Sequence, residues 1–239
     1  MNIKKEYWIV SLVVLAFIGV GIYLANDSTS GDSANNLNPP AHNKAIVGDT
    51  SFLRPYSHAT GSLSAPVTLV EFGDFGSQAS ETAYPAIKTL RDKYANDSNF
   101  SFVFRNLPSS QLRTDQLAAS AAESAGAQNK YFEMHDLLFD KQNEWALSSN
   151  PITYFTNYAK QLGLNLDQFN SDTKGYKYFS NIDQDIADAS KFGVSVPPIF
   201  YIVGGNRLSP YAGVADLGKM VTQVDSLMKA ADAANGKKK

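Results

Sequence analysis

The sequence contains no cysteine and only three histidines, His42, His58 and His135, among its 239 residues. The absence of cysteine excludes disulfide bonds, thiolate metal sites, iron–sulfur clusters and every reaction of a cysteine nucleophile in this chain. Neither sign of charge predominates, because 21 Lys and Arg against 23 Asp and Glu give a formal net charge of −2. Such a chain offers no broad basic surface to nucleic acid. We therefore expect no metal, no organic cofactor and no nucleic-acid partner.

Near the N-terminus, residues 7–25 (YWIVSLVVLAFIGVGIYLA) carry no charge and are long enough to cross a bilayer core of about 30 Å as a helix. Lys4 and Lys5 precede this segment, and cationic residues favour the cytoplasmic side of a membrane. The pattern predicts a cytoplasmic stub and one transmembrane anchor within residues 1–25, with the rest of the chain extracytoplasmic, on the periplasmic or cell-wall side. The alternative is a cleaved signal peptide, but the apolar run is long for one and no clear small-x-small cleavage site follows it.

Between residues 26 and 60 the composition shifts to Asn, Ser, Gly and Pro, with few large apolar residues. This composition is typical of a flexible tether, and we predict one for residues 26–60. His42 and His58 fall in or near this region, and both are expected to be exposed to solvent.

From residue 61 onward, runs of β-forming residues alternate with helical patterns. VTLVEF at 67–72 and FSFVF at 100–104 predict two strands, with a helix over 77–94 between them. Helical spacing dominates residues 114–142, and further helices are predicted from Asn150 to Gly163 and over 176–192. A strand at 199–203, a hairpin turn at 204–206 and a last helix to Met228 follow. The order predicts an α/β fold with a helical block between its second and third strands.

Several pieces of the sequence, in this order and spacing, resemble the membrane-anchored DsbA-like thiol–disulfide oxidoreductases. The pieces are APVTLVEFGDF, FRNLP, AAESAGAQNKYFEMHDLLF, YAKQLGLNLDQF and GVSVPPIFYIVGG, and the resemblance covers residues 61–228. The resemblance implies a thioredoxin-like fold with an inserted helical domain, preceded here by the transmembrane helix. It places the thioredoxin-like domain at residues 61–105 and 193–239, and the helical insertion at 106–192.

In that family a Cys-x-x-Cys motif begins the first helix, where this sequence reads Ser77-Gln78-Ala79-Ser80. The N-terminus of a helix stabilises a thiolate, and the thiolate then attacks a substrate disulfide. A serine hydroxyl is far less acidic and forms no bond that corresponds to a disulfide. The resemblance therefore implies that Ser77 and Ser80 occupy the catalytic positions without redox activity, and that Gln78 and Ala79 lie beside the bound substrate.

The resemblance also assigns roles to residues outside this motif. Glu71 matches an acid that assists proton transfer beneath the family's active site, and its alternative role is that of a half-exposed residue at a strand end. Pro198 matches a cis-proline that faces the motif and presents backbone to a bound peptide, although Pro197 before it has no N–H to donate. From the residues themselves, Asp74 is expected to shape the turn after the first strand, and His135 to be a buried structural histidine.

Three interpretations of the function stay open. In the preferred one, an exported scaffold of this family has lost its redox chemistry and binds exported polypeptides or envelope proteins without a covalent bond. In the second, an active oxidoreductase, served by a membrane thiol oxidase or a small-molecule oxidant, has had both cysteines deliberately replaced by serine. In the third, the protein is a serine hydrolase that uses Ser77, or a structural module of the envelope.

Overall fold

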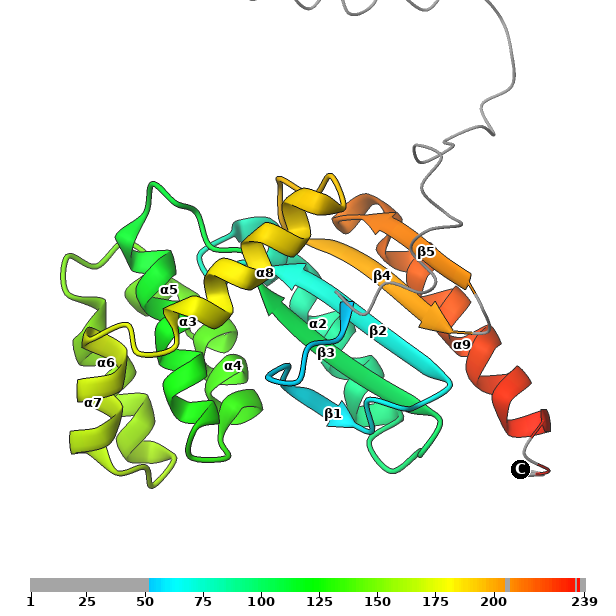
Figure 1. The fold of residues 1–239 in the computed structure, drawn as a ribbon, viewed down its shortest axis with the longest axis horizontal. Helices are drawn as coiled ribbons and strands as arrows, with labels where there is room; N and C mark the ends of the chain where they lie inside the picture. Colours follow the sequence, from blue (N-terminus) through cyan, green and yellow to red (C-terminus); the bar gives the residue numbers. More distant parts are fainter. Residues whose placement is uncertain (1–51, 205–206, 235, 237–239) are drawn as a thin grey trace, which may run out of the picture. The chain divides into compact units, whose positions relative to one another are not determined.

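The computed structural model of the chain describes residues 52–204, 207–234 and 236. These residues form a five-stranded sheet in the order β1-β3-β2-β4-β5, with helices on both faces (Figure 1). The strands are β1 (Ala59–Gly61), β2 (Val67–Gly73), β3 (Phe100–Asn106), β4 (Ile199–Gly204) and β5 (Arg207–Ala212). Helix α2 (Gln78–Lys93) joins the parallel pair β2 and β3, and the other neighbouring strands are antiparallel.

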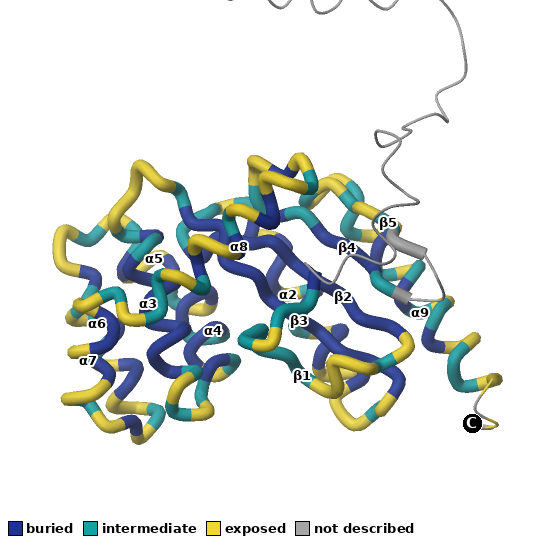
Figure 2. Tube along the Cα trace, viewed as in Figure 1, coloured by how far each residue is buried: buried dark blue, intermediate teal, exposed yellow. Residues whose placement is uncertain are grey.

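The central strand β2 is buried along its whole length because helices and loops cover both of its faces (Figure 2). Successive side chains of a strand point to opposite faces. Leu69 accordingly packs into the core shared with α2 and α9 (Leu217–Ala234), whereas Val70 and Phe72 pack into a second core on the side of α8 (Phe179–Lys191). The continuous apolar run in the sequence follows from this double burial, and the predicted α/β, thioredoxin-like arrangement is confirmed.

Between β3 and β4 the chain forms the inserted helices. They are α3 (Arg113–Gly126), α4 (Tyr131–Asp140), α5 (Gln142–Trp145), α6 (Pro151–Gln161), α7 (Leu166–Lys174) and α8. Small residues of α3 pack in the core, where Ala118 and Ala122 are fully buried. Helix α7 has no counterpart among the predicted helices, although Asn165 caps it by accepting a hydrogen bond from the backbone N–H of Gln168 at 3.0 Å.

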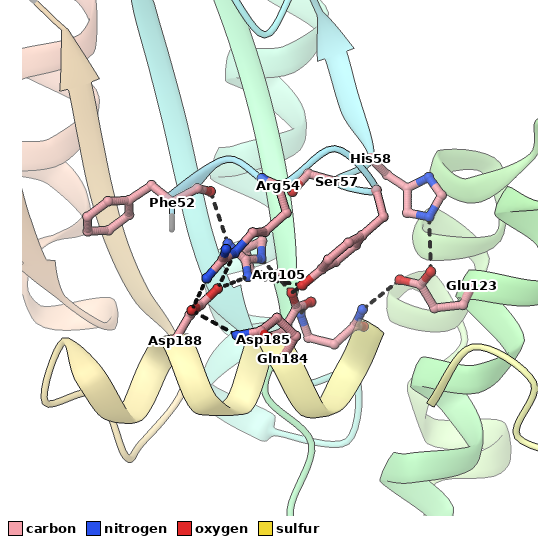
Figure 3. Close-up of polar contacts among 11 residues, drawn as sticks. Phe52, Arg54, Ser57, His58, Arg105, Glu123, Gln184, Asp185 and Asp188 are labelled. Carbon is pink, nitrogen blue, oxygen red and sulfur yellow. Dashed lines mark hydrogen bonds and ion pairs between the residues drawn. The ribbon is translucent and has the colours of Figure 1, made fainter. Parts of the chain in front are cut away.

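Residues 52–60 belong to the folded domain, so the prediction of a flexible tether over residues 26–60 is wrong for its last part. Arg54 donates hydrogen bonds of 2.9 and 2.6 Å to the two carboxyl oxygens of Asp188 in α8 (Figure 3). Strand β1 then pairs with β3. A few contacts with distant elements thus fix residues 52–60, although the average composition of residues 26–60 is typical of a tether.

His58 is held by the helical insertion, so its predicted exposure to solvent is also wrong. Its ring stacks on the ring of Tyr131, with centroids 3.9 Å apart. Its Nε2 lies 3.1 Å from a carboxyl oxygen of Glu123 in α3 (Figure 3). Both partners of His58 are far from it in the sequence, in α3 and α4. The residues next to His58 therefore give no sign of these contacts.

Other predictions concern residues outside the described part of the chain. The transmembrane segment predicted for residues 7–25 lies there, as do residues 26–51, which include His42. Within the described residues, no helix combines the length and the apolar character that a bilayer span requires. The anchor therefore stays a prediction from the sequence.

Candidate functional site

The site is built on the turn that leads from β2 into α2, and we call residues 74–77 the serine turn. The backbone N–H of Ser77 donates to the carbonyl of Asp74 at 3.1 Å. The Oδ1 of Asp74 also accepts a hydrogen bond of 2.9 Å from the N–H of Gly76. An aspartate that accepts from the backbone two residues ahead stabilises a tight turn. Asp74 therefore shapes this turn, as the sequence predicts.

Ser77 and Ser80 lie at the N-terminal tip of α2. Ser77 is the N-cap residue, and its Oγ accepts from the N–H of Ser80 at 3.4 Å. Ser80 is fully buried, and its Oγ accepts from the N–H of Asp74 at 3.3 Å. Gln78 is exposed and Ala79 is half-buried. Both hydroxyl groups thus accept hydrogen bonds from backbone N–H groups of the serine turn and the first helical turn, and for Ser77 this is the stabilising role of an N-cap serine.

A serine nucleophile needs a hydrogen-bonded base, and neither histidine in the described part of the chain bonds to Ser77. His135 is buried, and its Nδ1 lies 2.9 Å from Oδ1 of Asp136. Burial lowers the pKa of His135 to about 4, so its ring is neutral at pH 7. His58 pairs with Glu123 instead. His135 is therefore a structural residue, as predicted, and the geometry gives the hydrolase interpretation no support.

Glu71 is buried in the middle of β2, so the alternative of a half-exposed residue at a strand end is wrong. It stands in register with Phe104 of β3 and Phe200 of β4, with only 2% of its surface exposed. Its Oε1 has no hydrogen-bond partner among the described residues, and a Cβ placed on Gly73 would lie 2.8 Å from that oxygen. Burial raises the pKa of Glu71 to about 8, against the opposing charge of Arg91. Its carboxyl group is therefore protonated at pH 7.

Pro198 and the serine turn lie at the same end of the two neighbouring strands β4 and β2. The Pro197–Pro198 peptide bond is cis, as the resemblance implies. Pro198 directly precedes β4, whose first residue Ile199 pairs with Phe72 near the end of β2. Val196, two residues earlier, exposes 70% of its surface. An apolar side chain thus stands in solvent beside the cis bond.

Two further side chains hold the serine turn, and sequence reasoning missed both. Gln142 of α5 donates from its Nε2 to the carbonyls of Phe75 at 2.7 Å and Ser77 at 3.2 Å. Asp115 of α3 packs so closely on Gly76 that a Cβ there would collide with its Oδ1. Each lies among other polar residues on a helix far along the chain, and nothing in its neighbourhood signals a role at the turn.

The loop between β3 and α3, residues 107–112, borders a surface cavity of about 480 Å³. The N–H of Ser109 in this loop donates to Oδ2 of Asp74 at 3.2 Å, which ties the loop to the serine turn. The cavity is lined by Ser110, Gln111, Arg113, Gln116, Tyr176 and Phe179. A surface cavity with polar and apolar lining residues therefore borders the loop that is bonded to the serine turn.

Comparison with known proteins gives a family match and distant curated relatives. A family model described as Thioredoxin matches residues 54–221. The Na⁺/H⁺ antiporter NhaA 1 of Salinispora arenicola is 34% identical over 155 residues, which are 64% of this chain and 22% of the antiporter. The NhaA antiporter of Nitrosospira multiformis is 27% identical over 173 residues, or 72% of this chain and 26% of that protein. The chain thus spans only about a quarter of the length of these relatives.

Solved structures of similar fold cover nearly the whole described domain. BdbD from Bacillus subtilis has a TM-score of 0.63 and 19% identity, covering 73% of this chain and 94% of that one. Wolbachia pipientis alpha-DsbA1 gives 0.65 and 20%, covering 76% and 95%. A thioredoxin-like oxidoreductase from Silicibacter pomeroyi gives 0.58 and 25%, covering 75% and 98%. The chain therefore belongs to the thioredoxin family and has the fold of the DsbA-type thiol–disulfide oxidoreductases.

Proposed function

We propose that this protein is a membrane-anchored, extracytoplasmic thioredoxin-fold protein that binds exported polypeptides without a covalent bond and performs no thiol–disulfide exchange. The observation that carries the proposal is the placement of Ser77 and Ser80 at the tip of α2, in a chain without any cysteine. Their hydroxyl groups accept backbone hydrogen bonds and lie where the resemblance puts two sulfur atoms. Electron transfer to or from a client disulfide needs those sulfur atoms.

Two features at this end of the sheet favour contact with an extended polypeptide. Gln78 is exposed in the first turn of α2, and Val196 is exposed just before the cis Pro197–Pro198 bond. A client at this end of the sheet would therefore meet both polar and apolar groups. Pro197 has no N–H, which removes one backbone donor from any strand-like pairing at this point. We therefore assign most of the affinity to apolar contact at Val196 and to side-chain hydrogen bonds.

The anchor in this proposal rests on the sequence of residues 7–25. The two relatives named above are Na⁺/H⁺ antiporters by their names, and in them the matching region is a minor part of a longer chain. A domain of this kind attached to a membrane protein supports a position at the membrane surface for this chain as well.

The experiment that tests the proposal measures redox activity and binding on the same purified protein. The wild type should neither reduce insulin nor oxidise a dithiol peptide above a heat-inactivated control. It should bind a carboxymethylated, unfolded polypeptide, whose blocked thiols exclude a mixed disulfide. Val196→Asp should weaken that binding at least about tenfold, because the loss of a buried apolar contact and the burial of a charge each exceed about 1.4 kcal/mol.

Leu147→Asp is the matched control, because Leu147 is fully exposed on the loop between α5 and α6. Turnover by the wild type would overturn the redox part of the proposal. Equal binding by Val196→Asp and Leu147→Asp would overturn the assignment of the binding surface.

The second interpretation, an oxidoreductase with deliberately replaced cysteines, makes a different prediction for the double variant Ser77→Cys, Ser80→Cys. The buried neutral Glu71 still lies beside Gly73, ahead of the turn, as a proton-transfer acid would. Full recovery of insulin reduction in the double variant would favour that interpretation. An inert double variant would favour the first interpretation, in which the scaffold has lost its redox activity and the rest of the site has changed as well.

A further inference from the structure

Two cavities meet at Arg113 on the helical insertion. One is the cavity beside the β3–α3 loop, and the second, also of about 480 Å³, lies where α3, α6 and α7 pack against one another (Figure 1). Arg113, the first residue of α3, lines both of them. Each volume falls in the range of about 300–1,000 Å³ that is usual for a small-ligand site. An elongated ligand can thus occupy both cavities while it passes Arg113.

The charges that line the two cavities are all positive. Arg113 and Lys174, the last residue of α7, both line the second cavity, and both are exposed. Neither side chain forms an ion pair or a hydrogen bond with another described residue, whereas the neighbouring Lys177 lies 3.0 Å from Asp172. Among the described residues that line the two cavities, none is acidic. Two unpaired cations in such a lining favour an anionic ligand.

The other side chains of the second cavity are mainly amides and hydroxyls, and several of them already hold one another in place. Thr156 donates to Oδ1 of Asn170 at 2.7 Å, and Asn150 donates from its Nδ2 to Oγ1 of Thr153 at 3.0 Å. These bonds leave the amide donor of Asn170 and the amide oxygen of Asn150 for a ligand. A sugar hydroxyl both donates and accepts, so a ligand rich in hydroxyl groups matches this lining.

The first cavity adds two aromatic rings. Tyr176 and Phe179 line it together with Arg113, and their rings meet edge to face with centroids 5.6 Å apart. Tyr176 has a φ of +50°, a conformation that a bulky side chain rarely adopts and that the surrounding fold must maintain. The face of an aromatic ring packs on the C–H groups of a sugar ring. An aromatic surface beside a cation therefore matches a sugar that carries a carboxylate.

We propose that the two cavities form a binding site for an acidic oligosaccharide, whose carboxylate pairs with the guanidinium of Arg113. A planar guanidinium binds a carboxylate through two parallel hydrogen bonds. One sugar ring then lies against Tyr176 and Phe179, and the next extends toward Lys174 and the amides of the second cavity. The site shares no lining residue with the polypeptide surface at Gln78 and Val196, so this inference does not rest on the proposed function.

The site is tested by calorimetric titration of the full-length protein with tetragalacturonate, in a polyoxyethylene detergent that carries no sugar. The wild type should bind this acidic tetramer at least about tenfold more tightly than maltotetraose, which has hydroxyl groups but no carboxylate. Arg113→Gln should weaken the binding of tetragalacturonate at least about tenfold, because it removes a hydrogen bond between charged groups. Lys174→Gln should weaken it by a smaller factor, since an exposed point charge attracts less than a bidentate pair.

Lys229→Gln is the matched control, because Lys229 is an exposed lysine of α9 that lines neither cavity. It removes the same charge as Lys174→Gln and should bind like the wild type. Acetylated and amidated tetraglutamate represents the other occupant, an acidic polypeptide with the same number of carboxylates. If it bound as tightly as tetragalacturonate, the assignment to a saccharide would be wrong.

Two further results would overturn the site itself. One is equal binding of tetragalacturonate by the wild type, Arg113→Gln and Lys229→Gln, which would place the ligand elsewhere on the protein. The other is the absence of binding by the wild type, which counts against the proposal whether or not the variants fold.

Discussion

Among single residues, Glu71 has a protonation state that is coupled to folding. Its pKa is raised by burial from 4.5 to about 8, so the folded protein holds a proton that the unfolded chain releases above pH 4.5. The stability that this group contributes is therefore fully present below pH 4.5 and is lost as the pH rises toward 8. The effect follows from the burial of the carboxyl group, whose Oε1 has no hydrogen-bond partner among the described residues to favour the charged form.

Glu71→Gln should remove this pH dependence, because the amide has nearly the same shape and does not ionise. Between pH 5 and pH 8 the free energy of unfolding of the wild type should fall on the order of 3 kcal/mol more than that of the variant. Urea denaturation at the two pH values measures the difference. Glu133→Gln, at an exposed glutamate paired with Lys130, should behave like the wild type. Parallel curves for wild type and Glu71→Gln would show that Glu71 is ionised in the fold.

Among the elements, β3, α8 and the segment before β1 are joined by the buried guanidinium of Arg105 (Figure 3). Its nitrogens lie 2.6 Å from Asp185 and 2.7 Å from Asp188, and one of them donates to the carbonyl of Phe52 at 3.1 Å. Asp188 also accepts from Arg54. The ion pairs thus hold together three parts of the chain that are far apart in the sequence.

Arg105→Met should destabilise the protein by about 3–5 kcal/mol, because it leaves two carboxylates buried beside an apolar side chain. Chemical denaturation at pH 7 measures the loss. Lys219→Met breaks an exposed pair with Asp216 and should cost no more than about 1 kcal/mol. A loss for Arg105→Met as small as that of Lys219→Met would mean that the three parts are held by their apolar contacts alone.

The sequence predicts those elements whose formation depends on residues close together in the chain. The strand at 67–72 appears as a continuous apolar run because both of its faces are buried, and the serine turn follows from the spacing of Ser77 and Ser80 after it. The segment 52–60 and helix α7 were missed because their order depends on distant partners. Asp115 was missed for the same reason, since its role arises only where α3 meets the serine turn.

For the whole molecule, the prediction from the sequence is an anchored protein with its domain outside the cytoplasm. Expressed in bacterial cells, the full-length chain should sediment with membranes, and protease added to spheroplasts should digest its domain. Replacing Val13 and Leu15 by Arg should abolish insertion, because each charge at the centre of a span costs about 2.5–3.5 kcal/mol. The same change at Asn35 and Asn36 should have no effect. A shortened, soluble exported chain would show that residues 7–25 are a signal peptide instead.

The two borders of the sheet limit how copies of this domain associate. Edge strands with free N–H and C=O groups are templates on which other chains aggregate. Here one border is β1, a strand of only 3 residues, and the other is β5, whose Pro210 has no N–H to offer. At high concentration, neighbouring copies therefore meet through their side chains, and continuous fibre growth by strand addition is disfavoured from both ends of the sheet.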